Sequence, residues 1–302
     1  DMLKHDLYKR MAHIYEDQLD DADKAIEAYR AMVEIDDMDV ESLNALENLY
    51  TNASNWTELL SVLKLKADVG NGDERVDILR KMASINRDFL NNAEGAIENY
   101  SEILDNVSDD MDALNALESL YTQTENWEKL AENYEIKLNL TSDADEKHVL
   151  LNQMAQLQEE KLKAYDDAIM YHVQVLDLFP DDEETLDALD RLYLSQEQYE
   201  DLADILQKKL DHHQDDDLAT SLEFRLGQIN ANELSNIDAA LDYYRSILAR
   251  EPKHEGAVEA LNKLLEDETY RLDVSKILEN VYATNEQYDK LVDILEIQCE
   301  IE

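Results

Sequence analysis

The sequence repeats itself at an interval of 71 or 72 residues. An alanine that is followed four residues later by an aromatic ring recurs at Ala25, Ala96, Ala168 and Ala240. A second string, ALENLY and related forms, recurs at the same intervals at 45–50, 116–121, 188–193 and 260–265. Two markers that keep one register over most of a chain indicate a repeat protein, in which each unit packs on its neighbours.

A third marker follows the second by six residues. Trp56, Trp127 and Tyr199 stand six positions after the tyrosine that ends the second string in the first three units. A regular series of aromatic rings is suited to stacking a ligand. Each ring is also followed by leucine at the third position, which is the spacing of one helix face. We therefore interpret the series as core residues that pack back on the preceding tyrosine.

Composition restricts the repeat to helices. The 302 residues include only five Gly and two Pro, which leaves almost no turn residues for a β-sheet protein. Apolar residues recur at steps of three and four, as in Leu7, Met11 and Ile14, the spacing of an amphipathic helix. Asp- and Asn-rich breaks separate these stripes, and their side chains can cap the next helix. The sequence predicts an all-α fold with four helices per period, about 16 or 17 in total, and no strand.

Several positions match a known repeat family. Small residues occupy one position in the first helix of each period, at Ala12, Ala83, Ala155 and Gly227. With Pro180 and Pro252 behind two of the second helices, these odd-numbered hairpins resemble tetratricopeptide repeats. The even-numbered hairpins resemble the family less well, because larger residues replace its small one, at Glu47, Glu118, Asp190 and Asn262. This alternation is similar to the long tandem repeat proteins of myxobacteria and related bacteria.

The resemblance implies one right-handed α-solenoid over residues 1–302. Its units cover about 1–74, 75–146, 147–216 and 217–302. The last unit breaks the interval. An aromatic marker is expected six residues after Leu265, but it comes later, at Tyr288. Apolar residues at helical spacing between them predict an inserted helix near 268–283.

The resemblance also implies a protein-interaction scaffold without enzymatic activity, in which the first helices of the hairpins line a concave groove. We expect an acidic groove lined by Lys9, His13, Asn44, Asn48, Arg80, Ser84, Arg87, Asn115, Ser119, Asn152, Gln156, Arg191 and Gln228. Several of the scarce basic residues belong to this set. An equally good interpretation is that they only offset neighbouring carboxylates.

The charge balance limits the class of partner. Asp and Glu outnumber Lys and Arg by 72 to 27, which gives a formal net charge of −45. Nucleic-acid affinity comes from clustered Lys and Arg, so we expect no nucleic-acid partner. The charge favours a protein or peptide partner of basic character, or adaptation to salt, or both. Cation binding at turns such as Asp215-Asp216-Asp217 is disfavoured, because no turn has the spacing of a calcium loop.

No motif indicates catalysis, a cofactor or a metal site. The histidines include no His-Glu-x-x-His pair, and His172 takes the position of a tyrosine in other units, so we assign it a packing role. Gly70 and Gly72 precede acidic residues that would repel a phosphate. The single cysteine, Cys299, excludes an internal disulfide framework and fits a reducing compartment. No apolar run is long enough to cross a bilayer. We expect a soluble protein without cofactor, with the cytoplasm favoured.

Apolar residues near both ends of the sequence support a different function. Leu3 and Leu7 begin the first helical stripe, and the last stripe contains Leu291, Ile294, Leu295 and Ile297. No further helix of the sequence is available to cover either stripe, and solenoids need polar surfaces at their ends. The alternative to the scaffold is therefore a structural segment of a longer repeat array or of an end-to-end filament, and we expect self-association.

Overall fold

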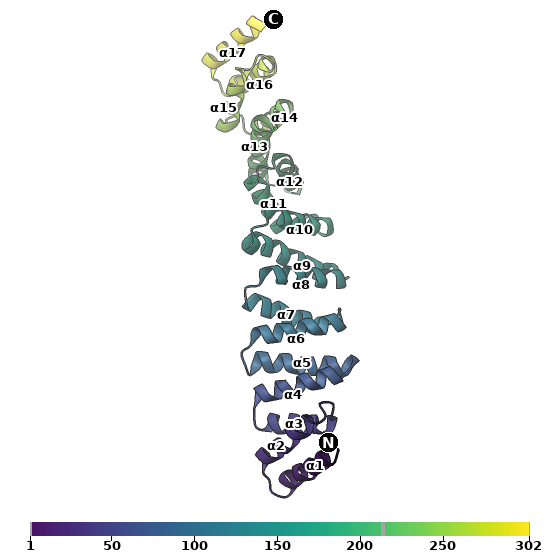
Figure 1. Ribbon diagram of the computed structural model, residues 1–302. Coiled ribbons are helices and arrows are strands. Elements are labelled where there is room, and N and C mark those ends of the chain that lie inside the picture. Colours follow the sequence, from purple (N-terminus) through teal and green to yellow (C-terminus); the bar gives the residue numbers. More distant parts are fainter. Residues whose placement is uncertain (1, 213–214, 302) are drawn as a thin grey trace. The chain divides into compact units, whose positions relative to one another are not determined.

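The computed structural model describes residues 2–212 and 215–301, and within these ranges it contains only helices (Figure 1). The elements are α1 (Met2–Asp17), α2 (Ala22–Val33), α3 (Val40–Asn52), α4 (Trp56–Val69), α5 (Gly72–Asp88), α6 (Ala93–Asn106), α7 (Met111–Gln123), α8 (Trp127–Leu140), α9 (Ala144–Leu157), η1 (Gln158–Leu162), α10 (Tyr165–Leu178), α11 (Glu183–Ser195), α12 (Tyr199–His212), α13 (Asp216–Asn232), α14 (Ile237–Arg250), α15 (Glu255–Leu264), α16 (Arg271–Thr284) and α17 (Tyr288–Ile301). The element η1 is a single π-helical turn, and the others are α-helices. The all-α prediction is confirmed.

The polar breaks in the sequence begin the helices as expected. The side chain of Asn55 accepts a hydrogen bond from the backbone N–H of Glu58, and Asn126 does the same for Lys129. Asp110 and Asp182 cap α7 and α11 in the same way. Such caps satisfy N–H groups that have no partner within the helix and stabilise it by about 1 kcal/mol each.

The helices pair into hairpins through turns that share one backbone feature. Among the described residues, those other than glycine with a left-handed conformation are Asp20, Ser54, Asn91, Glu125, Lys163, Glu197, Ser235 and Glu286. Each lies in the turn of one hairpin, with φ between 50° and 57°. These turns define eight hairpins in the described chain, and α15 is the helix that belongs to none of them.

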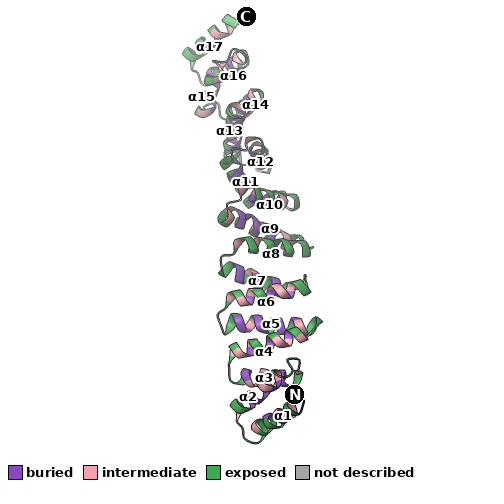
Figure 2. Ribbon diagram, in the orientation of Figure 1, coloured by how far each residue is buried: buried purple, intermediate pink, exposed green. Residues whose placement is uncertain are grey.

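The chain divides into two compact units, one made of residues 1–150 and 160–162 and the other of residues 151–159 and 163–302. In the first unit, each helix from α1 to α8 packs on the next one along the chain. In the second unit, the same holds from α10 to α17, with further contacts of α15 to α13 and of α16 to α14. Buried residues lie along the packed sides of the helices (Figure 2). This sequential packing is that of an α-solenoid of hairpins. The handedness and the four-unit division stay predictions.

The even-numbered hairpins contain a polar pair where the family has a small residue. Glu47 of α3 accepts a hydrogen bond from Lys66 of α4. The same pairing joins Glu118 to Lys137 and Asp190 to Lys209, always 19 residues apart. These side chains are 10% to 26% exposed. A carboxylate that reaches a lysine across the hairpin thus replaces the close contact of small residues.

A fourth pair of this kind shows how the structure accommodates the break in the 72-residue repeat interval. Glu279 of α16 accepts from Gln298 of α17, again 19 residues later. The carbonyl of Tyr282 accepts the N–H of Gln287 at 2.9 Å, as Tyr50, Tyr121 and Tyr193 do in their turns. The pair α16/α17 is therefore equivalent to α3/α4. Since Glu279 follows Asp190 by 89 residues instead of 72, an excess of 17 residues accommodates the additional helix α15.

No helix among residues 2–212 and 215–301 is long and apolar enough to span a membrane. Cys299 lies on α17 as a free, exposed thiol.

Candidate functional site

In the first unit, the first helices of successive hairpins are joined by ion pairs. The side chain of His5 on α1 lies 3.0 Å from the carboxylate of Asp39, the residue that caps α3. Lys9 of α1 donates to Glu41 of α3. On α5, the guanidinium of Arg80 contacts Asp110, which caps α7. The helices α1 and α3, and likewise α5 and α7, therefore lie side by side, and the predicted groove positions of this unit lie on them.

The basic residues predicted in the groove all contact carboxylates. Lys9 and His13 share Glu41, Arg80 contacts Asp110, Arg87 contacts Asp88, and in the second unit Arg191 binds Glu159 with two hydrogen bonds. The hydrogen bond to Glu41 raises the pKa of Lys9, and the hydrogen bond from Arg191 lowers the pKa of Glu159. These contacts support the interpretation that the basic residues offset neighbouring carboxylates.

The uncharged candidates differ in their surroundings. In the first unit, Asn48, Asn115 and Ser119 are exposed on α3 and α7. Asn44 accepts a hydrogen bond from Lys66 at 2.7 Å, and Ser84 donates to the carbonyl of Lys81. In the second unit, Gln156 and Gln228 are exposed and Asn152 is half-buried. The structure thus brings Lys9 together with His13 at Glu41, and distributes the other candidates over several helices.

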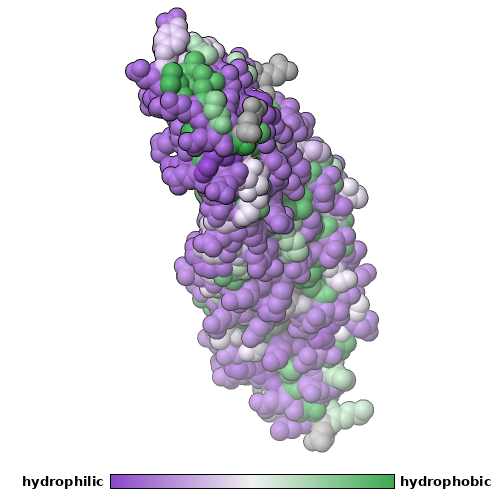
Figure 3. All heavy atoms as spheres, turned by 90° about the horizontal axis from the view of Figure 1, so that it is seen from above, coloured by the Kyte–Doolittle hydropathy of each residue, from purple (hydrophilic) through white to green (hydrophobic). Residues whose placement is uncertain are grey.

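Hydrophilic side chains cover most of the face of the molecule in Figure 3, with smaller apolar areas between them. Asp and Glu make up 72 of the 302 residues. Among the residues that the structure describes, no group of three or more His, Cys, Asp or Glu is arranged to hold a metal ion. The chain is therefore strongly anionic, and its described carboxylates are not gathered into a metal site.

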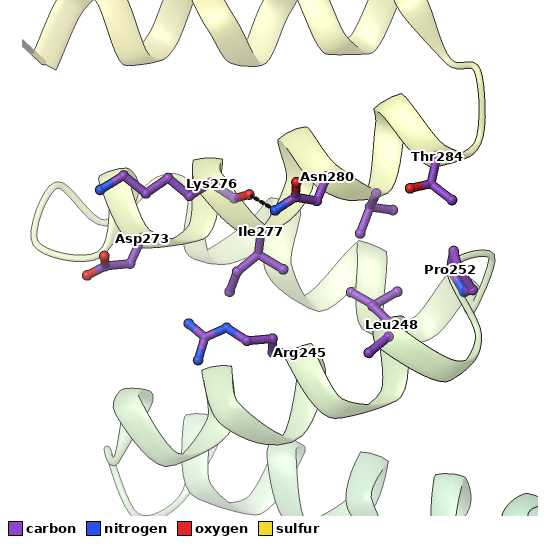
Figure 4. Close-up of a pocket in the computed structure, with 10 residues that line it drawn as sticks. Arg245, Leu248, Pro252, Asp273, Lys276, Ile277, Asn280 and Thr284 are labelled. Carbon is purple, nitrogen blue, oxygen red and sulfur yellow. Dashed lines mark hydrogen bonds between the residues drawn. The ribbon is translucent and has the colours of Figure 1, made fainter.

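The second unit contains a pocket that the sequence does not predict. A cavity of about 430 Å³ lies between α14 and α16. Leu248 of α14 and Ile277 of α16 point into it, and Arg245 and Asn280 lie at its edge (Figure 4). An apolar floor with a polar rim suits an apolar group that has a polar end.

The aromatic series is less buried than predicted. Trp56, Trp127 and Tyr199 are half-buried. Trp56 stacks on Phe89 with ring centres 4.0 Å apart, and the ammonium of Lys161 lies 5.1 Å from the ring of Trp127. For the two tryptophans, these contacts are made with residues at the turn of the following hairpin. His172, in contrast, is 8% exposed, as its packing role requires, and burial lowers its pKa.

A family model described as tetratricopeptide repeat matches residues 113–147 and 185–220. These segments contain α7/α8 and α11/α12, which are even-numbered hairpins. The expectation that even hairpins are the degenerate ones is therefore wrong for these two. Glu118 and Asp190 are larger than the small residue that the family has at this position. The hairpin accommodates them because each forms a hydrogen bond with a lysine of the facing helix, Lys137 or Lys209.

The chain is similar to several solved structures, which cover different shares of it. MamA is 18% identical, with a TM-score of 0.32, over 59% of this chain and 93% of its own. YrrB, a protein with tetratricopeptide repeats and an unusual peptide-binding site, is 16% identical, with a TM-score of 0.33, over 68% of this chain and 96% of its own. The Naa15/Naa10 complex bound to HypK-THB contains a chain that is 13% identical, with a TM-score of 0.44, over 97% of this chain and 46% of its own.

A comparison with curated proteins found no match. The similarity to myxobacterial proteins is not among the findings of these comparisons and stays a prediction. Proteins of this fold are in general interaction scaffolds and not enzymes. The family model thus identifies tetratricopeptide repeats in two segments of this chain, and the helical hairpins of the described residues follow the same pattern.

Proposed function

We propose that the chain is an interaction scaffold that binds a basic protein or peptide along the first helices of its hairpins. The observation that carries the proposal is the pairing of the basic candidates. Because Lys9, His13, Arg80, Arg87 and Arg191 already contact carboxylates, they offer little to an acidic partner. The large excess of carboxylates then attracts cations along this surface.

The uncharged groove residues can form short-range hydrogen bonds with a partner, in addition to the long-range attraction of the carboxylates. Asn48 and Asn115 lie at exposed positions of α3 and α7, and an amide side chain both donates and accepts hydrogen bonds. Such groups suit the backbone of an extended peptide. Attraction between charges brings the basic partner to the surface, and short-range hydrogen bonds orient it there.

The test is the binding of a fluorescent decapeptide of alternating Lys and Ala to the full chain, measured by anisotropy. We expect saturable binding that weakens between 50 mM and 500 mM NaCl. Asn48→Arg and Asn115→Arg should each weaken it at least fivefold. Thr57→Arg on α4 is the matched control, since it changes the net charge equally at an exposed position outside the groove. Equal effects of all three variants would show that binding is not located on the first helices.

A structural assembly is the second candidate, because α1 and α17 expose apolar side chains. Leu3 is 75% exposed on α1, and Tyr288 and Val292 are 64% and 52% exposed on α17. The expected stripe on α17 is mostly covered: only Leu295 is exposed, whereas Ile294 is 2% exposed and Leu291 and Ile297 are half-buried in the same core cluster as α16. Contact of the α1 and α17 faces of two copies would join them end to end. Sedimentation should then show concentration-dependent association that Val292→Glu abolishes, and a strictly monomeric chain would contradict it.

A further inference from the structure

A cavity of about 370 Å³ lies between α4 and α6, and α5 forms one side of it. All of its lining residues belong to the first unit. It is lined by Lys64 of α4, by Leu79 and Asn86 of α5, and by Gly95 and Asn99 of α6. On α5, its residues and the groove residues Arg80, Ser84 and Arg87 occupy different faces, because successive residues of a helix are about 100° apart. The cavity is therefore a surface separate from the groove of the proposed function.

The repeat itself shows what occupies the equivalent place elsewhere in the chain. Asn99 lies three residues after the marker Ala96, and Tyr243 lies three residues after Ala240. Tyr243 is half-buried in the second unit, and its hydroxyl donates to Gln207 Oε1 of α12 at 3.0 Å. Gln207 in turn stands at the repeat position of Lys64, eight residues after the aromatic marker of its helix. Hairpin α5/α6 thus lacks a ring that hairpin α13/α14 supplies from its own chain.

The residues around the cavity hold Asn99 away from that place. Asn86 Nδ2 donates to Asn99 Oδ1 at 3.0 Å, and Asn92 Nδ2 donates to Asn86 Oδ1 at 3.0 Å. Asn86 and Asn99 are 5% and 9% exposed. Gly95 is needed for this cluster, since a Cβ atom there would lie 2.4 Å from Asn92 Nδ2 and 2.9 Å from Asn86 Oδ1. The asparagines therefore satisfy one another and leave the space open.

Lys64 gives this space a polar end. Its side chain is exposed and makes no hydrogen bond or ion pair with the residues that the structure describes. In the second unit, the equivalent Gln207 accepts the tyrosine hydroxyl at 3.0 Å. An ammonium group in that position donates to the same hydroxyl oxygen. The cavity has apolar walls from Leu79 and Met82, the amide cluster at one side and Lys64 at the other, and the Arg75–Glu102 ion pair also lines it.

We propose that this cavity binds the side chain of a tyrosine from a partner polypeptide. The ring lies between α4 and α6 as the ring of Tyr243 lies between α12 and α14, and its hydroxyl accepts a hydrogen bond from Lys64. Burying an aromatic ring against apolar walls supplies the affinity, and Lys64 supplies the preference for a hydroxyl. The partner uses the gap left where Asn99 replaces a tyrosine, so the site is independent of the acidic groove.

The probe for a first test is N-acetyl-L-tyrosinamide, added to the full ¹⁵N-labelled chain and followed by NMR. We expect saturable shifts, in the millimolar range, confined to amides of residues 60–68 and 95–102 and the side-chain amide of Asn86. N-acetyl-L-leucinamide should bind at least tenfold more weakly. Absence of saturable shifts up to about 20 mM, or equal binding of both probes, would overturn the proposal.

Two variants test the location. Asn99→Tyr should fill the cavity, raise the midpoint of thermal unfolding and weaken probe binding at least tenfold. Tyr243→Asn should open the equivalent space in the second unit and add a second set of shifting amides there. Unchanged probe binding in Asn99→Tyr would overturn the assignment.

Lys64→Met provides a variant that leaves the core intact in case Asn99→Tyr fails to fold. It should weaken tyrosinamide binding at least fivefold and leave the weaker binding of N-acetyl-L-phenylalaninamide unchanged. An equal loss for both probes would show that Lys64 does not recognise the hydroxyl.

Discussion

Replacing Glu47 by glutamine tests whether the carboxylate–lysine pairs of the even hairpins stabilise the fold. Glu47 accepts hydrogen bonds from Lys66 of its own hairpin and from Lys81 of the next one. The side chains of Glu47 and Lys66 are each 16% exposed. Glutamine keeps the shape and one acceptor oxygen but removes the charge, so both ammonium groups lose their counter-ion.

The expected loss follows from the degree of burial. An exposed ion pair contributes about 0–1 kcal/mol, whereas removing one partner of a fully buried pair costs about 3–5 kcal/mol. Glu47 lies between these limits, because Lys66 keeps Asn44 as a second acceptor at 2.7 Å. We therefore expect Glu47→Gln to lower the free energy of unfolding by about 2 kcal/mol at pH 7.

The effect should depend on pH in a defined direction. Burial alone would raise the pKa of Glu47, but the hydrogen bonds from Lys66 and Lys81 outweigh it and place the pKa below its ordinary value. Such a group stabilises the folded chain above its unfolded pKa of about 4.3, and the stabilisation is lost as the pH falls through the folded pKa. The difference between the wild type and Glu47→Gln should therefore shrink steadily below about pH 4.

Urea unfolding followed by tryptophan fluorescence measures this difference in the first unit, since both tryptophans, Trp56 and Trp127, lie there. The control is Glu41→Gln, which also removes a carboxylate shared by two basic side chains, Lys9 and His13, but at a position that is 51% exposed. It should cost less than about 1 kcal/mol. A loss for Glu47→Gln no larger than that of the control would refute the reasoning.

Three further expectations concern the turns, the aromatic series and the charge. Glu125→Gly should raise the free energy of unfolding by up to about 1 kcal/mol and Glu125→Val should lower it, because the residue has φ of 54°; urea titration compares them. Trp127→Ala should cost about 1–2 kcal/mol by the same measurement, less than the 3–5 kcal/mol of a buried aromatic residue, and the larger value would contradict its half-buried place. The thermal midpoint should rise from about 10 mM to 500 mM NaCl, and a much larger rise with micromolar calcium would indicate specific cation sites.

The hairpins were predictable because their determinants are local and repeat. The steps of three and four and the Asn and Asp caps are visible as residue types, and both appear in the structure at Asn55 and Asn126. The sequence predicts a helix near 268–283, and the structure has α16 there, at Arg271–Thr284. That α16 forms a hairpin with α17 could also have been predicted, because Tyr288 follows Tyr282 by the same six residues as Trp56 follows Tyr50. The string ends in Tyr282 but begins with Ile277 and not alanine, which concealed the match.

The surfaces were harder to predict, because they depend on which helices lie beside each other. The sequence shows Lys9 and Arg80 as basic, but their carboxylate partners lie about 30 residues away, on the next hairpin. The cavity between α4 and α6 depends on a missing side chain at Asn99, which is visible only by comparison with Tyr243. Trp127 is half-buried because it packs beside Lys161, near the turn of the next hairpin, and no pattern in the sequence indicates that contact.

The additional helix α15 has a consequence for how such a chain can change over evolutionary time. The 17 extra residues before α16 leave the next hairpin intact, with Glu279 and Gln298 at the usual separation of 19 residues. An insertion of this size in a globular domain would disturb contacts throughout one core. Here each helix depends on its immediate neighbours, so the cost of lengthening stays local. Genes for such chains can therefore gain single helices as well as whole hairpins, and each gain adds a new stretch of surface on which selection can act.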